Sequence, residues 1–316
     1  AKAVNLMTTD GGELMDYVNA PIGRARAPRA GLKPLFAVPT TAGTGSESTG
    51  VCVLDLLGLH VKSGISHWRL RPTLAIVDPL LTVSLPPEVT AAAGMDIVCH
   101  ALESYTARWY ETFERKTAET RVTYCGSNPV SDLWAEKALT LVARSFRTAV
   151  HDGDDLAARS DMMLAATFAG MGIGNAGVHI PHANAYPLAG MVRDFRPSGY
   201  PGDEAMLPHG MAVSLTAPEA FRYTFEAAPE RHLRAAELLA PGAAPARDEQ
   251  RLPQALIALQ RDIGIPSGIA EVGFTDSDVD ALVAGAVKQQ RLLSIAPRTP
   301  TEDDLAAILR GSFENW

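Results

Sequence analysis

The sequence is poor in cysteine and in aromatic residues, and it has no long uninterrupted hydrophobic run. Three cysteines among 316 residues cannot form a disulfide framework, and their odd number is typical of a reducing compartment, so we expect a cytoplasmic protein. The first ten residues lack the apolar core of a secretory signal. The least polar stretch, residues 162–178, is too short and too often interrupted for a membrane span, so we expect no membrane partner.

Positive charge is also scarce. Lysine and arginine together number 28 against 36 aspartates and glutamates, which gives a formal net charge of −8. Since no basic block offers phosphates a continuous surface, we expect no nucleic-acid partner. The hydrophobic fraction of 47% and the charged fraction of 20% are ordinary for globular proteins and exclude wholesale disorder. The length has room for two domains or for one large domain.

Short apolar runs come first along the chain, and helical spacing follows. Residues 35–38 and 74–77 are predicted strands, the first of them buried, and residues 49–57 and 59–65 form a predicted hairpin around Gly58. The pattern changes at Pro86-Pro87. Helices are predicted beyond it at residues 88–108, 131–151, 155–170, 209–223, 230–239, 252–263, 277–289 and 302–313. Strands followed by helices indicate an α+β chain or two separate domains, divided as 1–86 and 87–316.

One helix of the second part carries two candidate metal ligands. Asp96 and His100 are four residues apart, which puts both side chains on one face of a helix. The helix is apolar nearly all round and should be buried, and a buried carboxylate and imidazole need a partner. A divalent cation would supply that partner. The alternative is an ordinary ion pair between the two side chains.

Two further histidines, His182 and His209, each follow a proline and open a predicted helix. With Asp96 and His100 they would present one oxygen and three nitrogen donors, a set that suits Fe(II) or Zn(II) rather than Mg(II) or Ca(II). For any one histidine alone, a hydrogen-bonded position in the core is the alternative. His179 is expected to orient a ligand. The other histidines are expected on solvated faces or in turns: His60, His67, His151 and His232.

Residues 39–47 form a loop that is rich in small and hydroxyl-bearing residues and follows a predicted strand. Gly43 and Gly45 allow a ligand to approach the backbone, and the threonine and serine hydroxyls can donate to phosphate or ribose oxygens. The loop has neither the lysine of a Walker A motif nor the third glycine of a G-x-G-x-x-G motif. A tight turn between strands is the alternative interpretation.

Four segments together resemble the iron-containing (group III) alcohol dehydrogenase family, and the resemblance covers essentially the whole chain. They are PTTAGTGSE at 39–47, AGMDIVCHALESY at 93–105, HANAYPLAG at 182–190 and LPHGMAV at 207–213. Within the family, the chain is most similar to the hydroxyacid–oxoacid transhydrogenase branch. The segments that point to this branch are DYVNAPIG at 16–23, GSNPVSDLW at 126–134 and PERHL at 229–233.

The resemblance implies a fold, a metal site and a cofactor. The family fold is an α/β nucleotide-binding domain followed by an all-helical metal-binding domain, and we expect a homo-oligomer, most simply a dimer. The family's metal ligands correspond to Asp96, His100, His182 and His209, which would hold Fe²⁺ or, alternatively, Zn²⁺. The family's contacts to the nicotinamide and ribose of NAD correspond to Thr40, Thr41, Thr44, Lys62 and Thr82.

The chain departs from the family pattern at two places. Many members carry a second histidine four residues after the His182 position for proton transfer, and Tyr186 stands there, so we expect Tyr186 or solvent to move the proton. The family also has a Gly-Gly-Gly-Ser phosphate loop upstream. We expect residues 1–3 to be the remainder of the helix that follows this loop, and NAD to bind this truncated nucleotide-binding domain more weakly than it binds a full-length relative.

The resemblance also implies an activity, namely hydride transfer between a nicotinamide and a short hydroxyacid or alcohol, assisted by a metal ion. The implied substrates are 4-hydroxybutyrate and 2-oxoglutarate, and the location in a eukaryote would be mitochondrial. Because both substrates carry carboxylates, Arg193 and Arg196 are candidates to bind them, with an exposed loop pair as the alternative. The alternative functions are a broad-specificity NAD-dependent alcohol dehydrogenase and a catalytically silent fragment.

Overall fold

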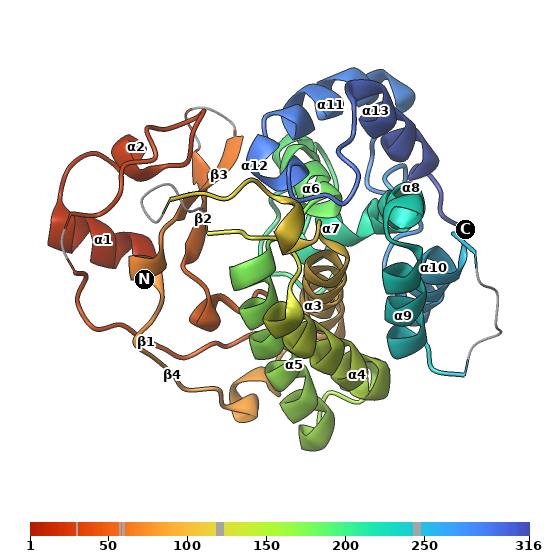
Figure 1. Cartoon of the computed structure of the whole chain (residues 1–316). Coiled ribbons are helices and arrows are strands. Elements are labelled where there is room, and N and C mark those ends of the chain that lie inside the picture. Colours follow the sequence, from red (N-terminus) through yellow and green to blue (C-terminus); the bar gives the residue numbers. More distant parts are fainter. Residues whose placement is uncertain (30, 57, 59–60, 118–122, 243–247) are drawn as a thin grey trace.

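The structure is a computed structural model that describes residues 1–316 apart from residues 30, 57, 59–60, 118–122 and 243–247. Figure 1 shows a smaller part, coloured red and orange, beside a larger body of helices. The smaller part contains helices α1 (Lys2–Asp10) and α2 (Leu14–Tyr17) and the four strands found in the described residues. A buried apolar cluster of its own lies there, and its members are Leu6, Tyr17, Val18, Ile65 and Leu70.

The strands form two separate pairs. β2 (Val51–Leu56) and β3 (Val61–Ser66) are antiparallel with Cys52 opposite Ile65, so the predicted hairpin is confirmed, although Leu57, Leu59 and His60 lie outside the described residues. β1 (Phe36–Ala37) and β4 (Leu74–Ala75) form a parallel pair. The predicted burial of the first strand is wrong, because Phe36 is 64% exposed. This pair is only two residues long, and Leu74, which lies opposite Phe36, is 50% exposed.

Helix α3 (Pro87–Thr106) runs through the middle of the helical body (Figure 1). Pro87 lies in its first turn, where the missing N–H costs nothing. α3 packs against α4 (Pro129–His151), α5 (Leu156–Ala176) and α7 (His209–Leu215) and is buried over most of its length. Gly94 allows the ring of Phe146 from α4 to lie against the α3 backbone, where an added Cβ would collide with it. α3 is therefore a buried helix, as its apolar sequence predicts.

The other helices complete the body. They are α6 (Ile180–Met191), α8 (Ala217–Thr224), α9 (Pro229–Leu239), α10 (Arg251–Asp262), α11 (Val279–Val287), α12 (Gln290–Leu293) and α13 (Glu302–Gly311). The single helix predicted over residues 209–223 is wrong, because the chain breaks at Thr216 into α7 and α8. Pro218 has no N–H to donate to the carbonyl oxygen of Ser214, and Gln260 Nε2 donates to that oxygen instead, at 2.8 Å.

The described strands all precede residue 76, and the described chain from Pro87 onward is helical apart from loops and one isolated bridge. The division into domains 1–86 and 87–316 stays a prediction. No single helix among the described residues is long and apolar enough to cross a membrane. The pair α5 and α6 passes the same test by length and composition, but a bend of 106° separates the two helices.

Candidate active site

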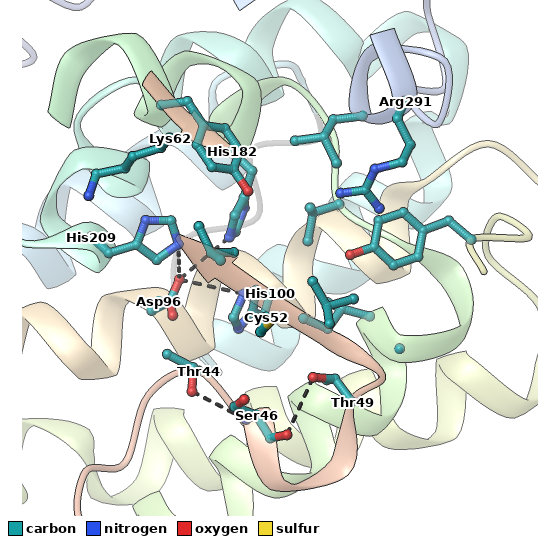
Figure 2. A pocket seen from close by; sticks show the side chains of 18 residues that line it. Thr44, Ser46, Thr49, Cys52, Lys62, Asp96, His100, His182, His209 and Arg291 are labelled. Carbon is teal, nitrogen blue, oxygen red and sulfur yellow. Dashed lines mark hydrogen bonds and ion pairs between the residues drawn. The ribbon is translucent and has the colours of Figure 1, made fainter. Parts of the chain in front are cut away.

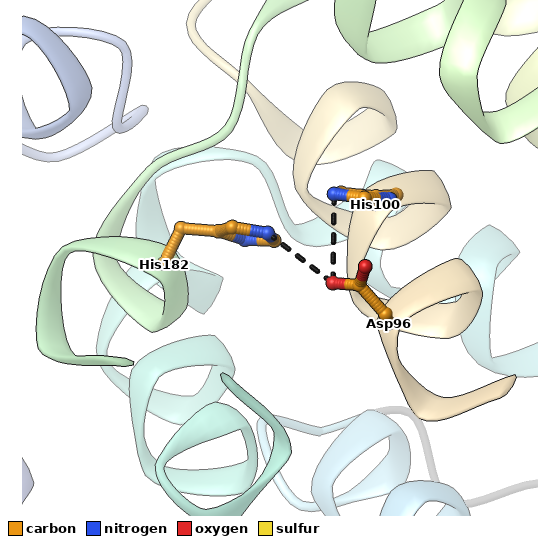
Figure 3. Close-up of side chains that lie close together, drawn as sticks. All are labelled: Asp96, His100 and His182. Carbon is orange, nitrogen blue, oxygen red and sulfur yellow. Dashed lines mark ion pairs between the residues drawn. The ribbon is translucent and has the colours of Figure 1, made fainter. Parts of the chain in front are cut away.

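Helices α3, α6 and α7 bring the four predicted metal ligands together. Asp96 Oδ1 lies 3.5 Å from His100 Nε2, 3.5 Å from His182 Nε2 and 3.7 Å from His209 Nε2. The rings of His100 and His182 are stacked, with centroids 4.8 Å apart. Figure 3 shows the first three side chains converging on one point, and Figure 2 shows His209 on the same side of the cavity. Asp96, His100 and His182 are all buried.

A glycine brings α7 close enough to α3 for this convergence. A Cβ added at Gly210 would collide with the carbonyl oxygen of Ala92 and would lie 2.9 Å from the backbone nitrogen of Asp96. Only a residue without a side chain fits this backbone approach. The position of His209 beside Asp96 therefore depends on the residue that follows it.

The four donors fit a metal ion of the kind that the sequence predicts. Asp96 Oδ1 and His182 Nε2 are buried and have no hydrogen-bond partner within the described chain, which is rare for such atoms. Ligand bonds of about 2.0–2.2 Å in a tetrahedral site separate neighbouring donor atoms by about 3.4 Å. The observed separations of 3.5–3.7 Å are close to this value and are too long for good hydrogen bonds. That the four residues bind a metal stays a prediction.

Glu103 is a residue of this site that the sequence analysis did not single out. It is fully buried on α3, and its carboxylate contacts Nδ1 of His182 and accepts hydrogen bonds from the backbone nitrogens of His179, at 2.7 Å, and His182, at 3.3 Å. Its position, three residues after His100 in an apolar helix, is the signal that could have identified it. The ring of His179, expected to orient a ligand, instead lies 3.1 Å from Thr106 Oγ1.

The charges of the cluster depend strongly on one another. Burial opposes ionisation of Asp96, but the imidazoles of His100, His209 and His182 outweigh it and hold the pKa of Asp96 far below its usual value. Burial lowers the pKa of His100 to about 4. Burial would do the same to His182, but Glu103 and Asp96 raise its pKa to about 10. The two carboxylates therefore favour the protonated imidazole of His182, and a metal ion bound at Nε2 would have to displace a proton there.

The cluster lies at the wall of a cavity of about 400 Å³ (Figure 2). Thr44 and Lys62, two of the predicted cofactor contacts, line this cavity. A second cavity of about 490 Å³ adjoins it, is lined by Thr40 and Thr41, and shares four residues with it, which are Thr44, Ser46, Cys52 and Val53. Thr82 lines neither cavity. It is fully buried and donates to the carbonyl oxygen of Pro79.

Lys2 holds the loop between these two cavities. Its ammonium group donates to the carbonyl oxygens of Ser46 at 2.6 Å, of Thr49 at 2.8 Å and of Val51 at 2.8 Å. The side chain is 93% buried in this position, and burial lowers the pKa of Lys2 to about 8. Helix α1 is therefore anchored to the segment that lines both cavities, which no local sequence pattern indicated.

Tyr186, which the sequence analysis expects, with solvent as the alternative, to move the proton, also lines the first cavity. Its ring centroid lies 6.4 Å from that of His209. Burial raises the pKa of Tyr186 to about 12, so its hydroxyl stays protonated near neutral pH and can donate a proton or a hydrogen bond. It cannot act as a base at that pH unless its surroundings change.

Two groups of sequence predictions need correction. Arg193 and Arg196 do not line the cavity, because Arg193 pairs with Asp278 at 2.8 Å and Arg196 donates to backbone carbonyls of its own loop. The cations that line the cavity are Lys62 and Arg291. His232 is not solvated but 1% exposed, with its ring bonded to Thr224 Oγ1 and to the carbonyl oxygen of Ala228. His151 is exposed as expected, and His67 is half-buried.

Two family profiles match most of the chain. The profile described as iron-containing alcohol dehydrogenase matches residues 1–79, and the one described as the C-terminal part of the Fe-containing alcohol dehydrogenase family matches residues 117–313. Among curated proteins, the mitochondrial hydroxyacid–oxoacid transhydrogenase of Bos taurus is 43% identical over 99% of this chain and 68% of its own length.

Solved structures give the same similarity. A 1,3-propanediol oxidoreductase superposes with a TM-score of 0.82 and 33% identity, over 99% of this chain and 73% of that one. Sulfoacetaldehyde reductase from Bifidobacterium kashiwanohense, solved in complex with NAD⁺, superposes with a TM-score of 0.78 and 27% identity, over 99% of this chain and 72% of that one. This chain thus spans about two thirds to three quarters of the length of these proteins, with 68% and 73% as the limits.

Proposed function

Since this chain belongs to the iron-containing alcohol dehydrogenase family, we propose that it works as a hydroxyacid–oxoacid transhydrogenase. The predicted family and its transhydrogenase branch are both confirmed. The observation that carries the proposal is the 43% identity, over 99% of this chain, to a protein of that name. One hydroxyacid would give up a hydride and an oxoacid would take it, with 4-hydroxybutyrate and 2-oxoglutarate as the pair. Both belong to the class of small-molecule substrates on which the family acts.

Two bound groups would supply the chemistry. An Fe²⁺ ion, or Zn²⁺ in its place, would be held by Asp96, His100, His182 and His209 and would act as a Lewis acid toward the substrate oxygen, while NAD would carry the hydride. The orphaned Asp96 and His182 atoms support the metal part of this proposal. The threonine-rich loop that lines both cavities supports the cofactor part, with Thr40, Thr41, Thr44 and Lys62 as contacts.

The side chains around the cluster have separate tasks. Glu103 fixes the ring of His182 through Nδ1 and so presents Nε2 to the cluster. Tyr186 has its hydroxyl protonated at neutral pH, and we assign to it a hydrogen bond to the substrate oxygen, at which it can also hold or release a proton. Asp96, His100 and His182 are themselves buried, which strengthens the polar contacts among them.

The decisive assay supplies NAD⁺ only in an amount equimolar with the protein, too little to serve as the stoichiometric oxidant. Protein that has been loaded with Fe²⁺ under anaerobic conditions should convert 4-hydroxybutyrate and 2-oxoglutarate into succinic semialdehyde and 2-hydroxyglutarate in equal amounts. Turnover of 4-hydroxybutyrate that needs excess NAD⁺ but no oxoacid would favour a simple dehydrogenase instead, an alternative that the similarity to 1,3-propanediol oxidoreductase supports. Folded, metal-loaded protein with neither activity would support the silent fragment.

We further propose that the protein is a homodimer and, if its source is eukaryotic, mitochondrial. The printed name of the bovine relative supports the location. Sedimentation equilibrium would test the dimer, and fractionation of the source cells would test the compartment. We expect neither nucleic acid nor membrane as a partner.

A further inference from the structure

We propose that Arg291 binds the carboxylate of the hydroxyacid or oxoacid and thereby selects acids over neutral alcohols. The proposal rests on the function proposed above, and it replaces Arg193 and Arg196 with a residue that faces the reacting end of the cavity. Arg291 comes from the short helix α12 and lines the same cavity as Asp96 and His182. Figure 2 shows its guanidinium group directed inward, across the cavity from Lys62.

The guanidinium group of Arg291 lacks the partner that its burial calls for. Its Nη1 atom is buried, and no hydrogen bond or ion pair of this side chain is found among the described residues. Buried donors of this kind nearly always have a partner in folded proteins, and a charged donor needs one most. Asp96 is the one carboxylate residue in the described lining, and the three imidazoles already surround it. The charge of Arg291 is therefore available to a ligand.

An aromatic ring holds Arg291 without using up its donors. The guanidinium carbon lies 4.7 Å from the ring centroid of Tyr124, a residue that is 6% exposed. Gly177 leaves room for this ring, because a Cβ added there would lie 2.8 Å from it. Contact between a guanidinium group and an aromatic ring leaves the N–H groups at the guanidinium edge free to bind in their own plane. That planar fork matches a carboxylate, which it can bind through two parallel hydrogen bonds.

The rest of the cavity is suited to a short acid held at both ends. Ile173, Val178 and Leu292 supply apolar lining, and a volume of about 400 Å³ is at the small end of the range for ligand sites. An acid with a hydroxyl or carbonyl oxygen at the Asp96 cluster would direct its carboxylate to Arg291. A neutral alcohol of the same length would leave the guanidinium group unpaired. A site whose buried polar group is paired only by the correct substrate strongly favours that substrate over an analogue that lacks the matching group. The expected substrates are therefore short acids in which two CH₂ groups separate the oxygen-bearing carbon from a carboxylate, as in 4-hydroxybutyrate and 2-oxoglutarate.

Kinetic measurements on two matched substrates test the proposal. Arg291→Met should lower kcat/KM for 4-hydroxybutyrate by on the order of a hundredfold or more, because two charge-assisted hydrogen bonds are lost. The same change should alter kcat/KM for 1-butanol, which lacks the carboxylate, by less than about threefold, and leave the KM for NAD⁺ unchanged. Arg291→Lys should recover only part of the loss, since lysine cannot bind in two parallel bonds. Arg193→Met, outside the cavity, is the matched control and should behave as the wild type. Equal losses on both substrates, or a raised KM for NAD⁺, would overturn the proposal.

A binding measurement separates this inference from the proposed function. Butyrate has the carboxylate but no hydroxyl or ketone group that could exchange a hydride. Calorimetric titration with butyrate therefore measures the contribution of Arg291 to carboxylate binding without turnover. We expect binding to the wild type and to Arg193→Met, and a loss of at least tenfold in affinity for Arg291→Met. If hydroxyacids are not turned over but butyrate binds in this way, the transhydrogenase function fails and the carboxylate site stands. If hydroxyacids are turned over equally by wild type and Arg291→Met, the carboxylate site fails and the function stands.

Discussion

The ring of His182 is held from behind by the carboxylate of Glu103, which contacts its Nδ1 atom. This contact fixes which ring nitrogen faces the cluster, and it turns Nε2 to within 3.5 Å of Asp96 Oδ1. Glu103 also accepts hydrogen bonds from two backbone nitrogens at the start of α6, so one buried carboxylate positions both the side chain and the helix that carries it. Contacts within the protein thus orient this predicted ligand toward the cluster.

Glu103→Gln should weaken metal binding by about 10- to 100-fold, because the amide cannot stabilise the ring orientation as a carboxylate does. The measurement is competition for Fe²⁺ or Zn²⁺ against a chelator of known affinity. Glu111→Gln, at an exposed position, is the control and should keep the wild-type affinity. Unchanged affinity in Glu103→Gln would show that the backbone of α6 alone positions His182.

Gly210→Ala should abolish metal binding and destabilise the protein. The added methyl group has to separate α7 from α3, which moves His209 away from Asp96. Overpacking of this kind typically costs about 1–3 kcal/mol in the free energy of unfolding. Urea titration and metal analysis would measure both effects. Gly31→Ala is the control, because nothing lies within 4 Å of the added Cβ there. A variant that retained full occupancy would contradict the assignment of His209 as a ligand.

Tyr186→Phe should lower kcat on the order of a hundredfold without changing the shape of the pH–rate profile between about pH 6 and 9. With the pKa of Tyr186 raised to about 12, the hydroxyl carries its proton throughout that range and contributes no ionisation to the profile. Tyr223→Phe, which removes a hydroxyl bonded to Asp304, is the matched control. A profile that loses an ionisation step near pH 7 in Tyr186→Phe would assign the tyrosine a lower pKa than burial gives it.

Lys2→Met should reduce the free energy of unfolding by about 1–3 kcal/mol, since three carbonyl oxygens lose a charged donor while the apolar stem is kept. Thermal or urea unfolding at pH 7, where the ammonium group is mostly charged, would measure the change. Lys33→Met, at an exposed position, should leave stability nearly as it was. If Lys2→Met is as stable as the control, water satisfies the three carbonyl oxygens equally well and Lys2 does not anchor α1.

The sequence predicted the centre of the site better than its surroundings. Asp96 and His100 could be recognised in the sequence because their four-residue spacing and apolar neighbours are local features. The prolines before His182 and His209 marked two helix starts. Their mutual distances could not be predicted from spacing, because they depend on the contact at Gly210 between segments far apart in the chain.

The sequence analysis missed residues whose contacts join segments far apart in the sequence. The hydrogen bonds of Lys2 join it to residues more than 40 positions away, and Arg291 reaches the cavity from a four-residue helix without any motif. The burial predicted for residues 35–38 was wrong for a related reason. An apolar run predicts a strand, but what covers the strand is decided by other parts of a fold, and Phe36 and Val38 remain 64% and 47% exposed.

The predicted ligands come from three helices that a ribosome would release at different times. Asp96 and His100 emerge together on α3, whereas His182 and His209 follow only after α4 and α5 have been synthesised. A nascent chain therefore exposes half of the donor set long before the rest exists. Binding of an ion by all four predicted ligands would therefore be a late event of biogenesis, completed only when α7 has left the exit tunnel and docked on α3.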